Sequence, residues 1–497
     1  MSEDQKSLKQ IMDFRIQKLK KLLDYGVNPY PSRYKPTHKS LFIKNNYADL
    51  ENSKVIVSGR IMAIRIMGKA SFVQLMDYEG RIQIFIKKDN LTDGVYEHFK
   101  LLDIGDHVGI NGKVFTTKTG EISINAQELV VLSKSIRPLP IVKEKDGEVY
   151  DAFNDKEQRY RNRHLDLILN PLVKKTFIKR TKILKSIRNY LDEQGFLEVE
   201  TPILQPIYGG ANARPFTTHH NTLGQDLFLR IADELYLKRL IIGGLDKVYE
   251  MSKDFRNEGM DKDHNPEFTM LEFYWAYSDY EDCMNLVEDL IKFVSIKVGS
   301  PVLDWGKNKF DLSQPFNRVP FFDLLKNELG YDISEMDYTQ LKKICLDKGL
   351  EVDSKNNVGQ LLDLLISELV EPKLIEPTFV TDYPKSISPL AKMHRNGNKN
   401  IVERFELFIG GSEFANSFSE LNDPIDQRRR LEEQVHLKEL GDDEAHPIDE
   451  SFIQAMENGM PPTGGVGIGI DRLTMLLTGN RSIKDVILFP ALKSEKE

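Results

Sequence analysis

Five short runs of alternating apolar and polar residues lie between Lys54 and Leu132, and they constrain the fold of this chain more than any other feature. Alternation with a period of two is typical of strands that bury one face, and turn residues such as Gly80 and Gly120 separate the runs. The runs are KVIVSGRIMAIRI, ASFVQLMD, RIQIFIKK, HVGINGKVFTT and ISINAQELVVL. One helical segment at 95–102 interrupts them. So many short strands in so short a stretch predict a small closed barrel.

The barrel pattern also indicates how the chain divides into domains. Its strand number and spacing are those of the OB fold, and an amphipathic helix at 4–25 precedes it. A stretch rich in proline and charged residues follows it. A chain of 497 residues has material for about three folding units. We predict an N-terminal helix and lead-in at 1–53, an OB-fold domain at 54–136, a linker at 137–155 and a second domain at 156–497.

The second domain mixes helices and strands without a regular βαβ order. A helical apolar pattern covers 172–194, and Gly195 ends that helix before the strand-like FLEVET. Strands are predicted at 226–231, 247–255, 267–277 and 402–420, with a helical insertion at about 296–375. This arrangement favours an α+β fold in which helices flank an antiparallel sheet.

Charge is distributed unevenly along the chain. Residues 1–145 contain 24 Lys and Arg against 16 Asp and Glu, whereas the remaining residues contain 44 against 60. A basic first third could contact nucleic-acid phosphates, and an acidic remainder suits cationic ligands or metal ions. Ordinary variation between two solvated surfaces is the alternative explanation.

Cysteine usage and the absence of long apolar runs bound the cellular context. Only Cys283 and Cys345 occur, which excludes a disulfide framework and a cysteine-rich zinc site. The N-terminal MSEDQKSLKQ is charged, and no apolar run is long enough to cross a bilayer. We therefore expect a cytoplasmic protein with no membrane partner.

Three glycines in GGVGIGIDR form the first candidate functional motif. Gly465, Gly467 and Gly469 share one face of a strand, while Val466 and Ile468 share the other. The Gly-x-Gly-x-x-Gly dinucleotide fingerprint is absent. A face without side chains lets a planar ligand approach the backbone, although close packing of a strand on a helix would also require small residues.

The second motif is FRNEGMDKDHNPEFTMLEFYWAY. A period of two places Arg256 and Glu258 on one face of the first strand, and Phe268, Glu272 and Tyr274 on one face of the second. These side chains could hold a polyphosphate, stack a base and bind an ammonium group. A solvated, charged sheet face is the alternative.

The third motif is RFELFIGGSEFANSFSELND. Glu406 and Glu413 stand on either side of a Gly-Gly step, so a turn could bring both carboxylates to one Mg²⁺ ion beside substrate phosphates. Glu420 follows on the next segment. Acidic decoration of a surface would give the same composition.

Together, the three clusters resemble motifs 2 and 3 of the class II aminoacyl-tRNA synthetases, and FLEVETPIL with its preceding helix resembles motif 1. The likeness is closest to the lysyl-tRNA synthetases and covers essentially the whole chain. It includes RIMGKASFVQL, RPFTTHHN, SFSELNDP, GIGIDRLTMLLT and DVILFP. It implies an ATP-dependent ligase that converts lysine to lysyl-adenylate with release of pyrophosphate, then transfers lysine to the 3′ end of tRNA(Lys).

The resemblance implies roles for the residues that match the family motifs. Arg256 would bridge the α-phosphate and the substrate carboxylate, and Arg472 would bind the γ-phosphate; these two are the implied catalytic residues. Phe268 would stack on adenine, and Glu406 and Glu413 would hold Mg²⁺. The implied ATP ligands are Arg256, Glu258, His264, Asn265, Phe268, Glu406 and Arg472.

Charge argues for a basic substrate, because Glu420 stands where an aspartate enzyme would need a cation. By resemblance, Glu420 and Tyr274 would bind the ε-ammonium, and Glu234 and Glu272 the α-ammonium, with the division between Glu272 and Glu420 left open. The Gly210 carbonyl would assist at the α-ammonium, and Asn416 would contact the carboxylate. The implied lysine ligands are Gly210, Glu234, Arg256, Glu272, Tyr274, Asn416 and Glu420.

The family uses its OB fold to read the anticodon, which places four residues of the barrel at candidate base contacts. They are Arg65, Phe72, Gln83 and Glu128. A place for Phe72 in the barrel core is the alternative. The motif 1 element implies a homodimer.

Particular residues and domains of the chain distinguish this function from three alternatives. Within the same fold, a synthetase for aspartate or asparagine is the runner-up, and Glu420 argues against it. An enzyme that loads lysine onto a protein would lack the barrel. A non-catalytic tRNA-binding paralogue would be expected to lose Arg256, Arg472 or the paired glutamates, which are all present.

Overall fold

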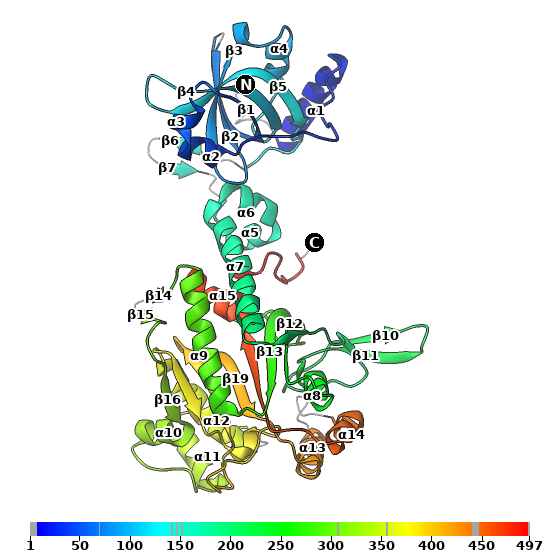
Figure 1. The fold of residues 1–497 in the computed structure, drawn as a ribbon, viewed down its shortest axis with the longest axis vertical. Coiled ribbons are helices and arrows are strands. Elements are labelled where there is room, and N and C mark those ends of the chain that lie inside the picture. Colours follow the sequence, from blue (N-terminus) through cyan, green and yellow to red (C-terminus); the bar gives the residue numbers. More distant parts are fainter. Residues whose placement is uncertain are drawn as a thin grey trace. The chain divides into compact units, whose positions relative to one another are not determined.

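The chain forms two compact units, Met1–Asn154 and Asp155–Glu497, in a computed structural model, and each unit is described by itself (Figure 1). We call them the barrel unit and the sheet unit. The structure describes residues 7–68, 70–140, 143–145, 148–150, 153–305, 308–353, 356–439 and 447–495. The division between the units falls at the end of the predicted linker, part of which lies outside the described residues.

A closed five-stranded barrel is the centre of the barrel unit, as the alternating runs predict. The strands are β1 (Lys54–Met67), β2 (Ala70–Met76), β3 (Arg81–Lys87), β4 (His107–Thr116) and β5 (Ile122–Ser133), in the order β1-β2-β3-β5-β4. Alternate residues such as Val55, Ile84 and Ile124 are fully buried inside. The 3-10 turn η2 (Lys88–Asn90) and α4 (Val95–Lys100) lie between β3 and β4.

Short helices precede the barrel, and buried ion pairs attach the first of them to it. The helices are α1 (Leu8–Asp24), α2 (Ser40–Asn45) and α3 (Tyr47–Leu50), and a small hairpin of β6 (Lys143–Lys145) and β7 (Glu148–Tyr150) follows the barrel. Lys18 of α1 contacts Asp103 at 2.5 Å, and the buried Lys134 binds the same carboxylate at 2.5 Å. Ion pairs of this kind fix α1 against the end of the barrel.

An eight-stranded, mainly antiparallel sheet organises the sheet unit, in the order β16-β17-β18-β19-β20-β13-β12-β8. Its strands are β8 (Leu197–Glu198), β12 (Lys247–Phe255), β13 (Glu267–Ala276), β16 (Asn317–Pro320), β17 (Thr378–Thr381), β18 (Arg404–Ile409), β19 (Ser412–Ser419) and β20 (Thr463–Gly469). Only the β12–β8 and β16–β17 pairs are parallel among the paired strands of this sheet in the described residues. The predicted α+β class is confirmed.

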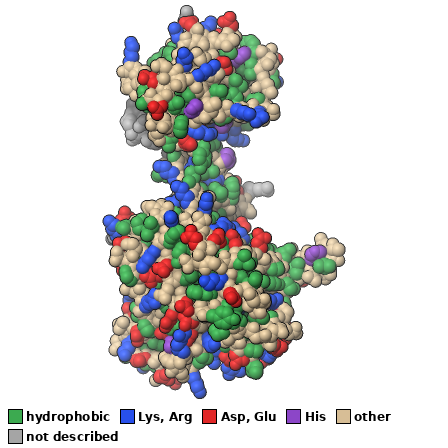
Figure 2. All heavy atoms as spheres, viewed as in Figure 1, with side chains coloured by type: hydrophobic (Ala, Val, Ile, Leu, Met, Phe, Trp, Pro, Cys, Tyr) green, Lys and Arg blue, Asp and Glu red, His purple; other side chains and the backbone are tan. Residues whose placement is uncertain are grey.

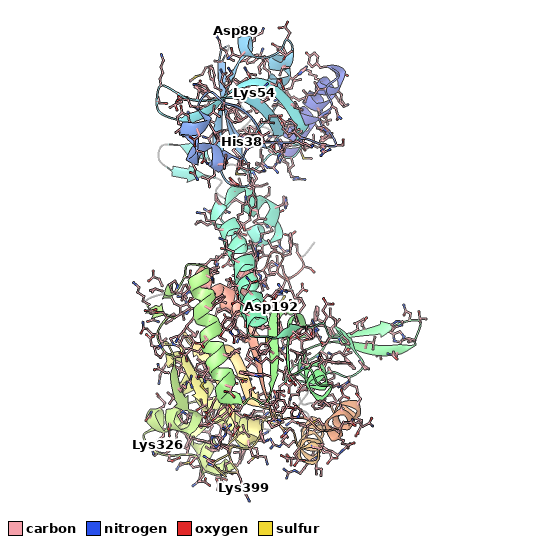
Figure 3. All side chains as sticks on the ribbon, viewed as in Figure 1. His38, Lys54, Asp89, Asp192, Lys326 and Lys399 are labelled. Carbon is pink, nitrogen blue, oxygen red and sulfur yellow. The ribbon has the colours of Figure 1, made fainter. Side chains whose placement is uncertain are left out.

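The two faces of this sheet differ in character. Phe273, Val466 and Ile468 point into a hydrophobic core that also contains buried residues of α7 (Pro171–Glu193) and α9 (Tyr280–Lys297). The residues that alternate with them, including Glu272, face the opposite side. Figure 3 labels Asp192 near the end of α7, where its carboxylate accepts a hydrogen bond of 2.9 Å from the Tyr249 hydroxyl of β12.

The sheet unit also contains helices, some of which pack against strands of the sheet. They are α5 (Lys156–Arg161), α6 (Arg163–Leu169), α7 (Pro171–Glu193), α8 (Glu234–Ile242), α9 (Tyr280–Lys297), α10 (Phe321–Leu329), α11 (Tyr338–Asp347), α12 (Val358–Leu369), α13 (Pro424–Glu439), α14 (Glu450–Glu457), α15 (Ile470–Thr478) and α16 (Ile483–Val486), with the 3-10 turns η3 (Glu371–Lys373) and η4 (Lys385–Ile387). A small sheet of β9 (Leu204–Gln205), β10 (Thr217–His220) and β11 (Gln225–Leu229) projects beside α8 (Figure 1).

The predicted helical insertion at about 296–375 differs from the structure in its first part. Strands β14 (Val302–Trp305), β15 (Asn308–Asp311) and β16 precede the helices α10 to α12. The β14–β15 hairpin has buried residues alternating along it, so its apolar residues follow period two rather than a helical period. The stretch is too short for that pattern to be distinguished from a helix by sequence.

Charged side chains of both signs are interspersed over the visible face of the sheet unit (Figure 2). None of the helices in the described part of the chain combines the length and the apolar character that a bilayer-spanning segment needs.

Candidate active site

A pocket of about 370 Å³ opens on the sheet face opposite the hydrophobic core. It brings together every residue for which the sequence predicted contact with ATP, lysine or a metal ion. These are Gly210, Glu234, Arg256, Glu258, His264, Asn265, Phe268, Glu272, Tyr274, Glu406, Glu413, Asn416, Glu420 and Arg472. Residues more than 250 positions apart in sequence, such as Gly210 and Arg472, therefore line one cavity.

Strand register explains how the sheet collects these groups. Residues directly opposite on neighbouring strands share a face. Glu272 of β13 is opposite Gly467 of β20, Gly467 is opposite Asn416 of β19, and Asn416 is opposite Glu406 of β18. One row of opposite residues across four strands therefore contains two carboxylates, one amide and one glycine.

The glycines of β20 make room for the pocket side chains. A Cβ atom at Gly465 would overlap Glu420 Oε1 and the Tyr274 ring. At Gly467 a Cβ would lie 3.0 Å from the Met270 methyl carbon. Gly465, Gly467 and Gly469 all line the cavity. Glycine is therefore required at 465 because pocket side chains already fill the space above the strand.

Three buried carboxylates form one end of the pocket. Glu234, Glu272 and Glu420 are each 5% exposed or less. Burial raises the pKa of all three, and for Glu272 burial together with Asp254 and Glu234 raises it to about 8. This end of the cavity is built to receive positive charge.

The hydrogen bonds within this end bear on the division of roles between Glu272 and Glu420, which the sequence left open. Tyr274 donates its hydroxyl to Glu272 Oε2 at 3.1 Å, and the Asp233 N–H donates to Glu272 Oε1 at 3.0 Å. Glu272 therefore lies between the groups assigned to the two ammonium ions, and its bonds associate it with Tyr274. The Cβ of Glu234 lies 3.0 Å from where a Cβ of Gly210 would be. The two residues predicted to bind the α-ammonium are therefore adjacent.

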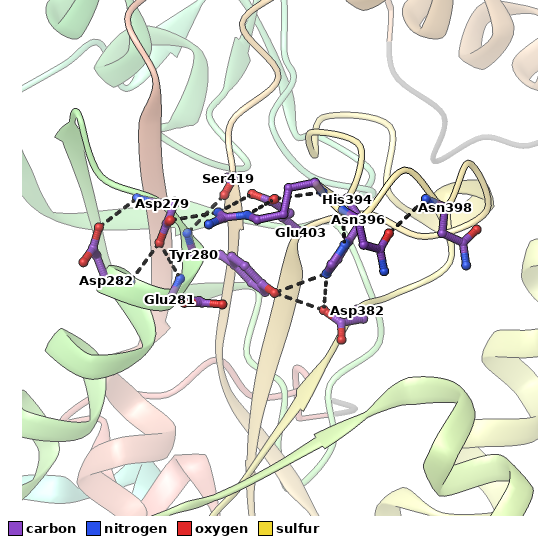
Figure 4. A network of polar contacts seen from close by, with 11 residues as sticks. Asp279, Tyr280, Glu281, Asp282, Asp382, His394, Asn396, Asn398, Glu403 and Ser419 are labelled. Atoms are coloured by element: carbon purple, nitrogen blue, oxygen red, sulfur yellow. Dashed lines mark hydrogen bonds and ion pairs between the residues drawn. The ribbon is translucent and has the colours of Figure 1, made fainter.

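A polar network fixes the strand end that leads to Glu420 (Figure 4). Arg395 binds Glu403, with Nε 2.5 Å from Oε1. The N–H of Ser419 donates to the Glu403 carbonyl at 2.9 Å, and the Ser419 hydroxyl accepts the Tyr280 N–H at 3.1 Å. The residue immediately before Glu420 is therefore held from two elements.

Two arginines lie toward the other end of the cavity. The Arg256 guanidinium lies 5.1 Å from the centre of the Phe268 ring, which is a cation–π contact. Arg472 donates from Nη1 to the Glu413 carbonyl at 2.9 Å, and its Nη2 lies 3.4 Å from His264 Nε2. The positive groups and the aromatic ring are thus in place for an anionic ligand with a planar base.

Asn265 differs from its neighbours in how its side chain is used. Its amide Nδ2 donates to the Glu267 carbonyl at 2.6 Å, and its Oδ1 accepts from the Ala491 N–H at 3.0 Å. The side chain braces the loop against the C-terminal segment, so a direct contact to a ligand would use its second N–H or the remaining lone pair of Oδ1.

Glu406 and Glu413 both line the cavity across the β18–β19 turn. Burial and the nearby Glu413 raise the pKa of Glu406 to about 7, against the lowering effect of Arg404. Part of this rise comes from repulsion between the two carboxylates, which a divalent cation would relieve. The donor set of this pair therefore fits Mg²⁺.

Comparison with known proteins agrees with the fold and the pocket. A family model described as class II tRNA synthetases (D, K and N) matches residues 155–493, and one described as an OB-fold nucleic acid binding domain matches residues 55–132. A lysine–tRNA ligase of Porphyromonas gingivalis is 51% identical over 493 residues, covering 97% of this chain and 85% of that protein. The lysine–tRNA ligase of Moorella thermoacetica is 49% identical over 98% of both chains.

The chain belongs to the lysine–tRNA ligase family of class II tRNA synthetases. The resemblance noted from the motifs is thereby confirmed. The likeness is not confined to one domain, because the lysine–tRNA ligase of Pelotomaculum thermopropionicum is also 49% identical over 98% of this chain.

Sequence reasoning missed several charged residues of this family member's pocket. Arg404 binds Glu406 Oε1 at 2.5 Å and donates to Asn416 Oδ1 at 3.2 Å. It lies two positions before Glu406 on the same strand, so period two could have found it. Lys238, one helical turn after Glu234, could have been found from the i, i+4 spacing.

A second buried cluster behind the pocket was also missed. Arg230 forms ion pairs with Asp233 at 2.9 Å, Glu250 at 2.7 Å and Asp254 at 3.4 Å. Carboxylate oxygens of Asp233, Asp254 and Glu272 lie within 4.8 Å of one another. One guanidinium therefore faces several acids. Burial, with a smaller contribution from Glu250, raises the pKa of Asp254 to about 6 against the lowering effect of Arg230 and Arg256.

The four predicted anticodon residues lie on outward-facing positions of the barrel strands. Arg65, Phe72 and Phe85 are opposite one another on β1, β2 and β3, and the two phenylalanine rings are 5.1 Å apart. Phe72 alternates with the buried Ser71 and Val73, so it does not belong to the barrel core. Gln83 donates to the Ser123 hydroxyl at 3.0 Å. Glu128 accepts from the Asn111 amide at 3.1 Å.

The raised pKa of Glu272 predicts that lysine binding depends on pH. In the empty pocket this carboxyl is protonated below about pH 8. An ammonium ion binds the ionised form, so lysine must displace a proton, and its affinity should fall by up to ~10-fold per pH unit from about pH 8 to about pH 6. Calorimetric titration in two buffers of different ionisation enthalpy would measure the affinity and the released proton. Affinity without pH dependence or proton release would contradict this expectation.

Proposed function

We propose that this protein activates L-lysine with ATP, forming lysyl-adenylate and pyrophosphate, and then transfers lysine to the 3′ end of tRNA(Lys). The observation that carries this proposal is the pocket itself, with three buried carboxylates at one end and Arg256, Arg472 and Phe268 toward the other. Such a cavity suits a dicationic amino acid placed next to a nucleotide.

Both reacting groups in the first step are anionic, so the site must neutralise charge and fix geometry. We assign Arg256 to the α-phosphate and the lysine carboxylate, where negative charge develops during attack. We assign Arg472 to the γ-phosphate of the departing pyrophosphate. Phe268 would stack on adenine, with Glu258, His264 and Asn265 around the nucleotide and Asn416 at the lysine carboxylate.

We also propose that Glu406 and Glu413 hold Mg²⁺. The carboxylate pair fits that ion through its charge and its hard oxygen donors. When bound, Mg²⁺ supplies charge neutralisation at the phosphate oxygens. Arg404 keeps Glu406 in place through its ion pair on the strand side.

For lysine, the proposal assigns Glu420 and Tyr274 to the ε-ammonium and Glu234 with the Gly210 carbonyl to the α-ammonium. Glu272 lies between these groups. A site for aspartate would need a cation at Glu420, and the family model alone includes the aspartate and asparagine enzymes. The acidic end of the pocket therefore favours lysine as the substrate. Its buried charges would stay unpaired with a neutral or acidic substrate.

The test is ATP–pyrophosphate exchange with each of the twenty standard amino acids. We expect exchange with lysine and at least ~10⁴-fold slower exchange with aspartate and asparagine. Exchange that depends on aspartate or asparagine would replace the substrate assignment. No exchange with any amino acid, from a protein that binds tRNA, would support a non-catalytic paralogue.

A separate prediction concerns reading of the tRNA by the barrel unit. Phe72→Ala should weaken tRNA charging by ~1–3 kcal/mol, the usual contribution of one stacked base, and leave pyrophosphate exchange unchanged. Phe42→Ala removes another exposed aromatic ring of the same unit and serves as the control. Equal charging by both variants and the wild type would move anticodon recognition away from Phe72.

We propose a homodimer because the motif 1 region exposes apolar side chains. Leu172, Leu197, Ile203 and Leu204 are between 45% and 74% exposed. A second copy would cover them. We expect a dimer in analytical ultracentrifugation at micromolar concentration, and dissociation or weaker association for Leu172→Glu. A stable, active monomer at that concentration would contradict the proposal.

A cytoplasmic location completes the proposal. It is supported by the two cysteines, Cys283 and Cys345, which are both free and buried.

A further inference from the structure

A buried lysine joins two of the pocket carboxylates from behind. Lys238 of α8 is fully buried. Its Nζ lies 2.5 Å from Glu234 Oε1 and also forms an ion pair with Glu420 Oε2. The sequence positions of the two glutamates are far apart, so Lys238 is the group that links the helix α8 to the segment after β19.

Each of these carboxylates presents its other oxygen to the pocket. Glu420 Oε1 lies over Gly465, where it leaves no space for a Cβ. Glu234 Oε2 lies on the side of Gly210, 3.7 Å from where a Cβ of that residue would be. Gly210 and Gly465 both line the cavity. One oxygen of each glutamate therefore binds Lys238, and the other remains for a ligand.

When Glu234, Glu272 and Glu420 are all ionised, the charges of this end balance with a doubly cationic ligand. Glu234, Glu272 and Glu420 supply three negative charges when ionised, and Lys238 supplies one positive charge. The α-ammonium and ε-ammonium of lysine supply the remaining two. A buried charge without a partner is costly, so the resident cation sets how many ammonium groups the ligand must bring.

We propose that Lys238 is a positioning residue that determines specificity for lysine, by fixing the spacing of Glu234 and Glu420 and favouring the ionised form of both. This inference rests on the proposed function, because it assigns those glutamates to the ammonium groups of the substrate. Lys238 itself does not touch the substrate and acts through the two carboxylates.

Other charged and titratable groups surround the pair and are held constant in the test. Glu272 and Tyr274 of β13 face Glu234 and Glu420, and Cys283 of α9 faces Glu420. Phe418 and Phe452 pack near the ammonium, 5.5 and 5.9 Å from it. The apolar surroundings give Lys238 no water-filled alternative to its two partners.

The experiment compares Lys238→Met with wild type in pyrophosphate exchange. We expect the KM for lysine to rise by ~30-fold or more, because loss of one member of a buried charge pair has effects of that size, while the KM for ATP changes little. Exchange with norleucine, which lacks the ε-ammonium, should be reduced much less than exchange with lysine. The discrimination between lysine and norleucine should therefore fall. The limb of the pH profile of kcat/KM for lysine should move to higher pH.

The matched control is Lys292→Met, because Lys292 forms an i, i+4 pair with Glu288 at 2.7 Å outside the pocket. Lys292→Met should leave the KM for lysine, the discrimination between lysine and norleucine, and the pH limb unchanged. Equal losses for lysine and norleucine with an unmoved pH limb in Lys238→Met would reduce Lys238 to a structural role. Absence of lysine-dependent exchange in the wild type would instead refute the proposed function.

If Lys238→Met does not fold, Lys238→Met/Glu420→Gln removes both members of one ion pair. Because Lys238 acts through the carboxylates, the double variant should bind lysine little more weakly than Glu420→Gln alone. Lys238→Arg keeps the charge and should retain the wild-type pH limb. A large further loss of lysine affinity in the double variant relative to Glu420→Gln, or a shifted limb in Lys238→Arg, would overturn the proposal.

Discussion

Arg256→Ala is expected to reduce lysine-dependent pyrophosphate exchange by ~10²–10³-fold, equivalent to ~3–4 kcal/mol of transition-state stabilisation. The guanidinium is held against the Phe268 ring at the cavity wall, so the alanine variant removes charge from the reaction centre without opening the hydrophobic core. The loss should appear mainly in kcat, since the charge that Arg256 meets develops during attack on the α-phosphate.

The measurement is steady-state exchange together with the thermal unfolding midpoint. Arg318→Ala is a suitable control, because Arg318 also packs its guanidinium near an aromatic ring, 5.8 Å from the centre of Phe379, and does not line the cavity. Near-normal exchange in a folded Arg256→Ala protein would remove Arg256 from the mechanism.

Glu420→Gln should have an effect of similar or larger size on a different quantity. It leaves the buried Lys238 with Glu234 as its remaining carboxylate partner and takes a negative charge from the ε-ammonium site. Breaking a buried pair typically costs ~3–5 kcal/mol, so kcat/KM for lysine should fall by ~10²–10⁴-fold. The KM for ATP should stay close to that of the wild type.

Glu288→Gln provides the matched comparison, since Glu288 is also buried and also paired with a lysine. In this case the lysine, Lys292, lies on the same helix. That variant should lose stability without losing lysine affinity. If Glu420→Gln binds lysine as well as the wild type, the acidic end of the pocket does not recognise the ε-ammonium.

Much of the fold could be predicted because local patterns agreed with the tertiary structure. The period-two runs became β1 to β5, and the strand predicted at 247–255 coincides with β12. The β14–β15 hairpin was missed because four-residue strands carry too little periodicity to be distinguished from a helix. Propensity decides little over such lengths, and packing against the rest of the unit decides more.

The composition of the site could be predicted better than its internal connections. Motif resemblance identified the residues that line the cavity, from Gly210 to Arg472. It did not reveal that Glu272 accepts a hydrogen bond from Tyr274, although both lie on one face of β13. Nor did it reveal that Lys238 joins Glu234 to Glu420, because the Lys238–Glu420 contact depends on side-chain directions across separate elements. Register and burial supply that information, and neither can be read from one sequence.

The space above Gly465 limits how this pocket could be redesigned. Any residue with a Cβ there would displace the Glu420 carboxylate or the Tyr274 ring, both of which occupy that space. A change of substrate therefore cannot begin by adding bulk to the floor of the cavity. It has to begin with Glu420 or Tyr274 themselves. The shortest mutational path to an enzyme for another amino acid therefore passes through variants that bind lysine weakly.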